Sequence, residues 1–145
     1  MIAALRLLHA ILGVAAVAIC LSIVILGPAA TAGLSETLFD ALTGTPHPAS
    51  GVWPATMDNE LRFYAPFWGA YGLVLLHVAR RLPATLSWIP PTAALFFVGG
   101  VGRAISWYAV GAPHPFFLLL MAIELVLPAI FLALWQMAKT SGRAT

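Results

Sequence analysis

Charge is scarce in this chain, and so is cysteine. Only 8% of the 145 residues are charged, and the formal net charge is +2. The basic residues are too few and too scattered for a nucleic-acid surface, so we expect no nucleic-acid partner. The single cysteine, Cys20, excludes an internal disulfide and a paired-thiol redox centre. It lies within an apolar stretch, and we interpret it as a small packing residue.

Apolar residues are abundant instead. They make up 61% of the chain, and the mean hydropathy is +0.96. A soluble domain of this length has too little interior to bury so much apolar surface. Apolar stretches of about 20 residues indicate membrane-spanning helices. We therefore predict an all-α membrane protein, a single domain (1–145) folded as an antiparallel bundle of four transmembrane helices. The expected helices cover about 2–26, 59–79, 90–110 and 116–137.

The beginning of the chain is similar to a secretory signal peptide. Arg6 precedes an apolar core, and Ala30-Thr31-Ala32 follows it. The core is longer than the roughly 7–15 residues of a signal peptide, so we expect a retained helix. Residues 27–58 are predicted to form an outer loop, because glycine and proline recur in them. Within it, residues 34–42 place leucine and phenylalanine at helical spacing, which predicts a short amphipathic helix at the membrane interface.

The basic residues predict an orientation. The predicted outer loop contains no lysine or arginine. By the positive-inside rule, both termini are expected in the cytoplasm and this loop outside. The basic residues that would share the cytoplasmic side are Arg6, Arg80, Arg81, Lys139 and Arg143.

Two ionisable residues fall deep within predicted membrane helices, Arg103 and Glu124. A charge inside a membrane is costly, so each needs a partner or a function. At about 1.5 Å of rise per residue, both lie roughly 10–14 Å below the outer ends of their helices. We therefore predict that they form an ion pair.

The helix expected at 59–79 adds polar and aromatic groups to the same outer half. Asp58 and Arg62 are four residues apart and can pair, and Asp58 or Asn59 can cap the helix. Glu60 and Tyr64 begin an aromatic stripe that continues through Phe67, Trp68 and Tyr71. This stripe either lines a pocket or packs in the core.

Prolines and glycines lie close to these charges. Pro66 and Pro128 each follow a charged residue by four positions, so each frees the carbonyl of that residue. A freed carbonyl in a membrane needs a partner, which favours a widened, hydrated cavity. The segment Gly99–Gly102 precedes Arg103 and predicts close helix packing, while Trp107 follows Arg103 on the same helix face.

The four histidines suggest two weaker hypotheses. His9 and His77 lie near the cytoplasmic ends of their helices, but we favour ordinary hydrogen bonding over haem ligation. His47 and His114 each lie between two prolines in outer segments. A metal shared between them is conceivable, with Asp58 or Glu60 as the oxygen ligand. Two histidines and an unplaced carboxylate are a weak signal, so we predict no metal site and no cofactor.

Four motifs resemble a known family: Asp58–Ala65 (DNELRFYA), Phe96–Arg103 (FxxGGVGR), Pro113–Pro115 (PHP) and Ile123–Pro128 (IELVLP). The chain is similar over nearly its whole length to small bacterial four-helix membrane proteins that are catalogued only as a domain of unknown function. The resemblance implies a four-span fold in a bacterial inner membrane. It implies no activity and no catalytic residues.

Three functional hypotheses follow. The first is a non-enzymatic protein that binds a membrane lipid, another lipophilic molecule or a partner membrane protein in an outward-facing pocket between the last three spans. The second is an isomerase, cyclase or hydrolase acting on a lipid-like or terpenoid substrate, with Glu124 as acid or base and Arg103 holding the substrate. The third is an accessory subunit of a larger complex or a homo-oligomer. The predicted ligand-binding residues are Asp58, Glu60, Arg62, Tyr64, Trp68, Arg103, Trp107, His114 and Glu124.

Overall fold

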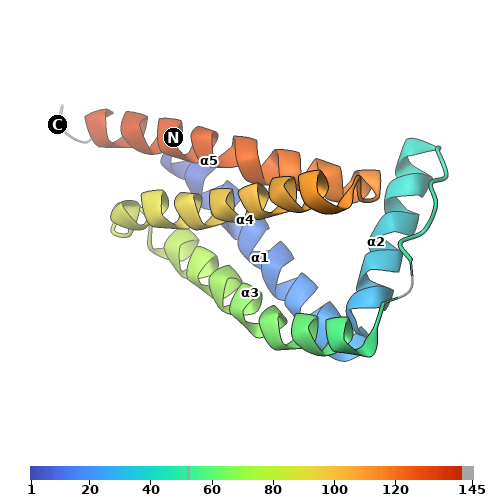
Figure 1. Ribbon diagram of the computed structural model, residues 1–145. Helices are drawn as coiled ribbons and strands as arrows, with labels where there is room; N and C mark the ends of the chain where they lie inside the picture. Colours follow the sequence, from blue (N-terminus) through green and yellow to red (C-terminus); the bar gives the residue numbers. More distant parts are fainter. Residues whose placement is uncertain (52, 142–145) are drawn as a thin grey trace.

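The computed structural model describes residues 1–51 and 53–141, which form helices joined by turns and loops and contain no strand. The described residues form five α-helices, which are labelled in Figure 1. They are α1 (Ile2–Leu26), α2 (Pro28–Thr43), α3 (Ala55–Arg81), α4 (Ile89–Val110) and α5 (Pro115–Ser141), with a 3₁₀ turn η1 (Leu86–Trp88) before α4. Arg143, which we counted among the cytoplasmic basic residues, lies outside the described residues.

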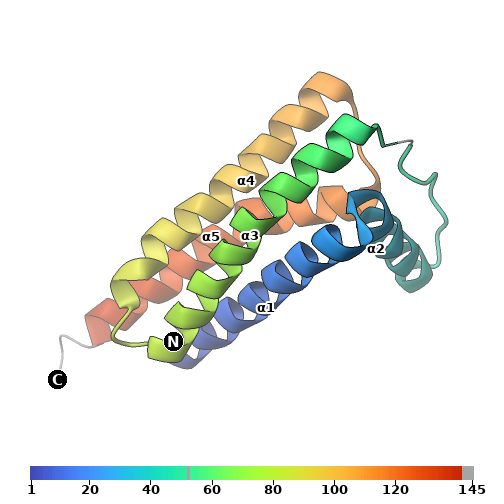
Figure 2. The same cartoon turned by 90° about the horizontal axis from the view of Figure 1, so that it is seen from below.

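The four long helices form two antiparallel pairs. Helix α1 packs along α3, and α4 packs along α5. The pairs meet at the end that carries both termini and diverge toward the other end, where α2 crosses the gap (Figures 1 and 2). The molecule is therefore a wedge that is closed at the terminal end and covered by α2 at the open end.

The main apolar core fills the closed end of the wedge. All four long helices contribute to it, through Leu5, Val78, Ile89, Ala93 and Phe131, and none of these side chains is more than 1% exposed. Arg6 donates from Nη2 to the Leu82 carbonyl (2.7 Å) and from Nε to the Ala79 carbonyl (3.2 Å). It thereby supplies hydrogen-bond donors to carbonyls at the end of α3, where a helix leaves them without partners.

Small residues bring α1 and α3 into close contact. A Cβ atom at Gly72 would lie 2.9 Å from the Gly13 carbonyl oxygen and 3.0 Å from the Ala16 Cβ atom. A Cβ atom at Gly69 would lie 2.7 Å from Cys20 Sγ. Small residues permit such close approach of helix backbones. Cys20 is therefore a packing residue, as predicted.

The sequence predicted the four long helices well but was wrong about residues 27–58. Sixteen of these residues form α2, which is seven residues longer than the helix expected at 34–42 and ends at Gly44 in a left-handed conformation. Pro28 occupies the first turn, where proline favours helix formation. Helix α3 begins at Ala55, four residues earlier than expected, with Pro54 rather than Asp58 or Asn59 at its N-cap.

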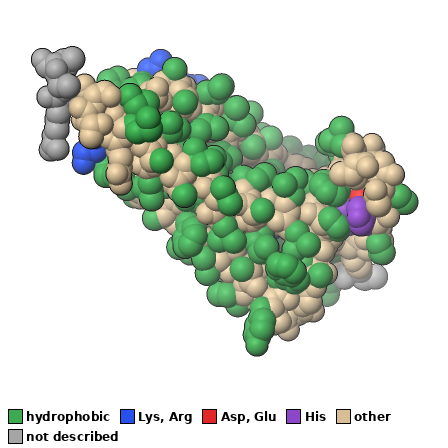
Figure 3. Space-filling model, turned by 90° about the horizontal axis from the view of Figure 1, so that it is seen from above, with side chains coloured by type: hydrophobic (Ala, Val, Ile, Leu, Met, Phe, Trp, Pro, Cys, Tyr) green, Lys and Arg blue, Asp and Glu red, His purple; other side chains and the backbone are tan. Residues whose placement is uncertain are grey.

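Three helical segments are long and apolar enough to cross a membrane: Ile2–Leu26, Leu86–Val110 and Pro115–Ser141. This indicates a membrane protein. The view in Figure 3 shows a surface that is mostly hydrophobic, with basic side chains toward the terminal end and a histidine and acidic cluster at the other end. Helix α3 is equally long, but it carries charges near both ends and is not among the three segments.

Candidate functional site

The divergence of the two helix pairs leaves a cavity of about 480 Å³ beneath α2. This volume lies within the roughly 300–1,000 Å³ range of small-molecule sites. Every α-helix contributes to the lining, and most of the lining side chains are apolar. Its walls include Leu12 and Ile19 from α1, Ala32 and Ser35 from α2, Trp68 and Tyr71 from α3, Phe96 and Arg103 from α4, and Phe117 and Glu124 from α5.

Arg103 and Glu124 form the predicted ion pair on the wall of this cavity. Arg103 Nε donates to Glu124 Oε2 over 2.8 Å. The Glu124 side chain is 7% exposed, whereas the Arg103 side chain is 38% exposed. A Cβ atom at Gly100 would lie 3.0 Å from the Glu124 Cβ atom, so the predicted close packing brings α4 against α5 at this level. The pair supplies the charged groups of a mostly apolar lining.

Three aromatic rings form the wall nearest the core. The ring centroids of Trp68 and Tyr71 are 5.4 Å apart, and those of Trp68 and Phe96 are 6.3 Å apart. The Tyr71 hydroxyl donates to the Thr92 carbonyl over 2.8 Å, which joins α3 to α4. Such offset aromatic contacts give a rigid apolar surface.

Helix α2 and the segment after it cover the cavity. Thr31, Ala32 and Ser35 face inward from α2, and Trp53 adds an aromatic ring. Glu36 is 4% exposed and accepts hydrogen bonds from the backbone N–H of Ser50 (3.0 Å) and from the Ser50 hydroxyl. Glu36 thus connects the segment after α2 back to the helix. In a helix lying at the membrane interface, this acidic side chain would face solvent, but here it is buried.

Several predicted ligand-binding residues lie outside the cavity lining. Asp58 and Arg62 pair over 2.7 Å, as predicted, but Arg62 also donates to the Val24 carbonyl (2.7 Å) and so joins α3 to the end of α1. Glu60 is exposed, and Tyr64 and Trp107 are 57% and 45% exposed. These residues lie in the first turns of α3 and the last turn of α4, at the open end of the wedge. There the two helices have diverged and do not pack against each other (Figure 1).

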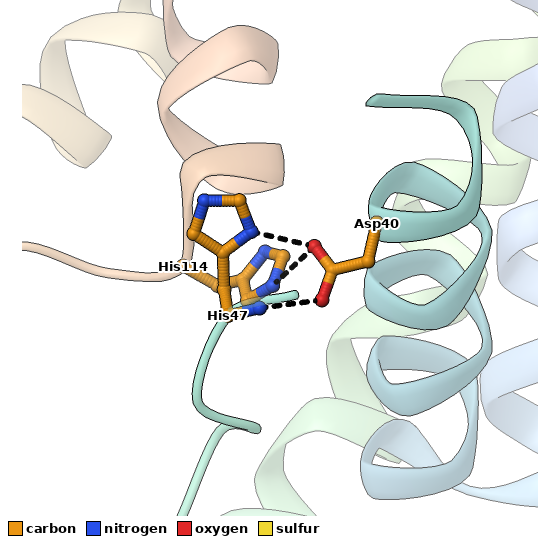
Figure 4. A group of neighbouring side chains, drawn as sticks. All are labelled: Asp40, His47 and His114. Atoms are coloured by element: carbon orange, nitrogen blue, oxygen red, sulfur yellow. Dashed lines mark hydrogen bonds and ion pairs between the residues drawn. The ribbon is translucent and has the colours of Figure 1, made fainter. Parts of the chain in front are cut away.

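His114 also lies away from the cavity, in a cluster with His47 and Asp40 (Figure 4). The imidazole centroids are 5.2 Å apart. His47 Nδ1 lies 2.7 Å and His114 Nε2 lies 3.4 Å from the same oxygen, Asp40 Oδ1. The carboxylate beside the two histidines is therefore Asp40, rather than Asp58 or Glu60. Hydrogen bonds from the His47 backbone and side chain lower the pKa of Asp40.

The structure adds a buried polar network that the sequence did not predict. His9 is fully buried, whereas His77 is exposed. His9 Nδ1 donates to the Leu5 carbonyl (2.9 Å), and Nε2 lies 3.5 Å from the Thr92 hydroxyl. Thr92 in turn accepts from Tyr71 at its carbonyl. The network links α1, α3 and α4 below the cavity. The signal in the sequence is a histidine inside an apolar stretch, and its hydrogen bonds agree with the ordinary role predicted for it.

A known family matches most of the chain. The sequence model described as "Domain of unknown function (DUF4345)" covers residues 4–135. The chain belongs to this family, as the motif resemblance had indicated. No curated protein and no solved structure matches the chain.

Proposed function

We propose that this member of the DUF4345 family binds one lipophilic molecule in the cavity beneath α2. The molecule would carry a polar group at one end, which would meet Arg103 and Glu124. The observation that supports this proposal best is the combination of a cavity of about 480 Å³ with a single ion pair on an apolar wall. A few convergent polar groups in an apolar pocket are typical of small-molecule sites.

The donors of Arg103 indicate what the polar group would be. A guanidinium group has five N–H donors, and within the described residues Arg103 makes one hydrogen bond, from Nε. The remaining donors suit a carbonyl, hydroxyl or anionic oxygen of the ligand. Trp68, Phe96 and Phe117 would contact its apolar body.

The proposal includes a place in the membrane. We propose a bacterial inner membrane, with four spans and both termini in the cytoplasm. At about 1.5 Å per residue, the 27 residues of α3 are long enough for a fourth span, and α3 stays beside α1. Arg6, Arg80, Arg81 and Lys139 would share the cytoplasmic side, so the cavity would lie in the outer half.

The two other hypotheses are outcomes of the same test. An isomerase, cyclase or hydrolase would use Glu124 as its acid or base, but the 2.8 Å bond from Arg103 occupies this carboxylate and favours a binding role. An accessory subunit would place the exposed apolar side chains of the long helices against a partner. Neither has an observation in its favour that the binding proposal lacks.

A matched pair of substitutions on α2 tests the binding proposal. Ser35 lines the cavity, whereas Thr37 is exposed, and each hydroxyl donates to the carbonyl four residues earlier (2.9 and 2.8 Å). Ser35→Trp should fill the cavity, and Thr37→Trp should add the same bulk outside it. Small molecules extracted from the purified proteins would be quantified by mass spectrometry. We expect retention to fall at least tenfold in Ser35→Trp and to stay unchanged in Thr37→Trp.

Two results would contradict the proposal. One is equal retention of the same molecule in both variants, which would place its binding outside the cavity. The other is a wild-type protein that carries no small molecule but copurifies with a protein partner in a fixed ratio, which would favour an accessory subunit. Turnover of a retained lipid that disappears in Glu124→Gln would favour the enzyme hypothesis.

A further inference from the structure

We propose that Asp40, His47 and His114 form a binding site for a divalent first-row transition metal ion, and we expect that ion to be Zn²⁺. The site joins three segments that are distant in sequence. Asp40 lies near the end of α2, His47 in the segment that follows, and His114 in the turn before α5 (Figure 4). It is separate from the cavity and from its ion pair, so it does not rest on the proposed ligand.

The distances between the three donor atoms fit a metal. All of them lie within 4.8 Å of one another. Tetrahedral zinc with bonds of about 2.0 Å places its ligand atoms about 3.3 Å apart. The His114 Nε2 to Asp40 Oδ1 distance is 3.4 Å, and the His47 Nδ1 to Asp40 Oδ1 distance is 2.7 Å. His47 Nδ1 would therefore have to move about 0.6 Å away from Asp40 Oδ1 to admit the ion.

The buried nitrogen of His114 points independently to a ligand. The His114 side chain is 2% exposed, and Nε2 has no hydrogen-bond partner within the described residues. A buried polar atom that has no hydrogen-bond partner costs free energy of folding, so its presence indicates a partner, such as a bound ion, that completes the site. Nε2 faces Asp40 Oδ1 at ion-pair distance without hydrogen-bond geometry, as a metal ligand beside its neighbouring ligand would.

The surroundings hold the ligands in place. The His47 backbone N–H donates to Asp40 Oδ2 over 2.8 Å, which orients the carboxylate and leaves Oδ1 facing both imidazoles. Such outer contacts orient metal ligands. Both histidines lie between two prolines, which restrict the backbone and reduce the entropy cost of ordering it.

Two local hydrogen bonds oppose metal binding. His47 Nδ1 donates to Asp40 Oδ1 over 2.7 Å and would have to lose its proton to bind the ion. The Phe116 backbone N–H donates to His114 Nδ1 over 3.2 Å, but a neutral imidazole that binds metal through Nε2 carries its proton on Nδ1. Metal binding would therefore replace this hydrogen bond. The two hydrogen bonds together are weaker than zinc ligation, so the balance favours the metal.

The donor set indicates the class of metal. Two imidazoles and one carboxylate suit zinc and related divalent ions, whereas Mg²⁺ and Ca²⁺ prefer oxygen ligands. Three protein ligands leave a fourth tetrahedral position. His47 and Asp40 are 25% and 20% exposed at their side chains, so water can reach that position.

The test is zinc binding by the full chain in detergent. Protein freed of metal by a chelator would be titrated with ZnCl₂ in competition with a chromophoric chelator. We expect one Zn²⁺ per chain, with affinity at least 100-fold lower in His114→Ala and Asp40→Asn. The matched controls are His77→Ala and Glu60→Gln, which remove an exposed histidine and an exposed carboxylate elsewhere and should change the affinity less than twofold.

A second measurement needs no variant. Co²⁺ added to the wild-type protein should give the intense visible absorption of a four-coordinate site, and Zn²⁺ should displace it. The proposal is overturned if wild type binds less than one Zn²⁺ per chain, or if bound Co²⁺ shows the weak spectrum of a six-coordinate ion. It is also overturned if His77→Ala weakens binding as much as His114→Ala.

Discussion

Arg103 and Glu124 show how a membrane helix can retain a charge. Each charge alone would be costly in an apolar bundle, and their 2.8 Å contact reduces that cost. The two residues differ in surroundings, because Glu124 is buried and Arg103 is partly open to the cavity. Losing both partners should therefore cost less stability than the sum of the two separate losses.

A double-mutant cycle tests this expectation. Arg103→Gln leaves a buried carboxylate without its partner and should destabilise the protein by about 1–3 kcal/mol. Glu124→Gln should also destabilise it, and the double variant should be less unstable than the sum of the two. The measurement is thermal unfolding in detergent, with the exposed Arg80→Gln as the control. Strict additivity would show that the two side chains do not interact.

At the scale of helices, glycine residues determine how closely α1 and α3 pack. Gly72 meets the backbone of Gly13, so the α1–α3 contact has no room for a methyl group. Gly102 is also helical, but a Cβ atom there would have no neighbour within 4 Å. The two glycines therefore separate the effect of packing from that of helix propensity.

Alanine at these two positions should have opposite effects. Gly102→Ala should be neutral or stabilising by up to about 1 kcal/mol, because alanine favours helix. Gly72→Ala should destabilise by about 1–3 kcal/mol, because a carbonyl oxygen 2.9 Å from the new methyl group cannot move aside. Thermal unfolding of the two variants in the same detergent would show this. Equal midpoints would contradict the close α1–α3 contact.

The long helices were predictable because each is one continuous apolar stretch, and their expected ends lie within about four residues of the observed ones. Helix α2 was predicted only in part, over residues 34–42, because the recurring glycines and prolines of residues 27–58 indicated a loop. Its stability comes from packing against the bundle and from contacts such as Glu36 with Ser50, which no local pattern contains.

The part of the candidate site that could be predicted is the ion pair, because the depth of each charged residue in its membrane helix follows from the sequence. Arg103 and Glu124 could be paired by counting residues from the outer turn. The ends of the diverging helices were not predictable, because helical spacing alone assigns Tyr64 to the same stripe as Trp68, although it is exposed in the structure. Asp40 was missed beside the two histidines because its position depends on where α2 lies in space.

At the scale of the whole molecule, the wedge gives the two ends different characters. The closed end has the apolar core and basic residues, and the open end has the cavity, α2 and the histidine cluster (Figures 1 and 3). This polarity matches the proposed orientation, with the basic end in the cytoplasm.

Cysteine labelling tests that orientation. In a Cys20→Ala background, Thr37→Cys places a thiol on exposed α2, and Ser87→Cys places one on the exposed turn before α4. A membrane-impermeant maleimide added to spheroplasts should label Thr37→Cys alone, and lysis should make Ser87→Cys reactive. Labelling of Ser87→Cys in intact spheroplasts would reverse the proposed orientation.

The central claim is that the cavity beneath α2 holds a lipophilic molecule. Native mass spectrometry of the gently purified wild-type protein tests it most directly. We predict a particle heavier than the bare chain by the mass of one small molecule, which is released on activation and is absent from Ser35→Trp. A particle with the mass of the bare chain, or one bound only to another protein, would contradict the account.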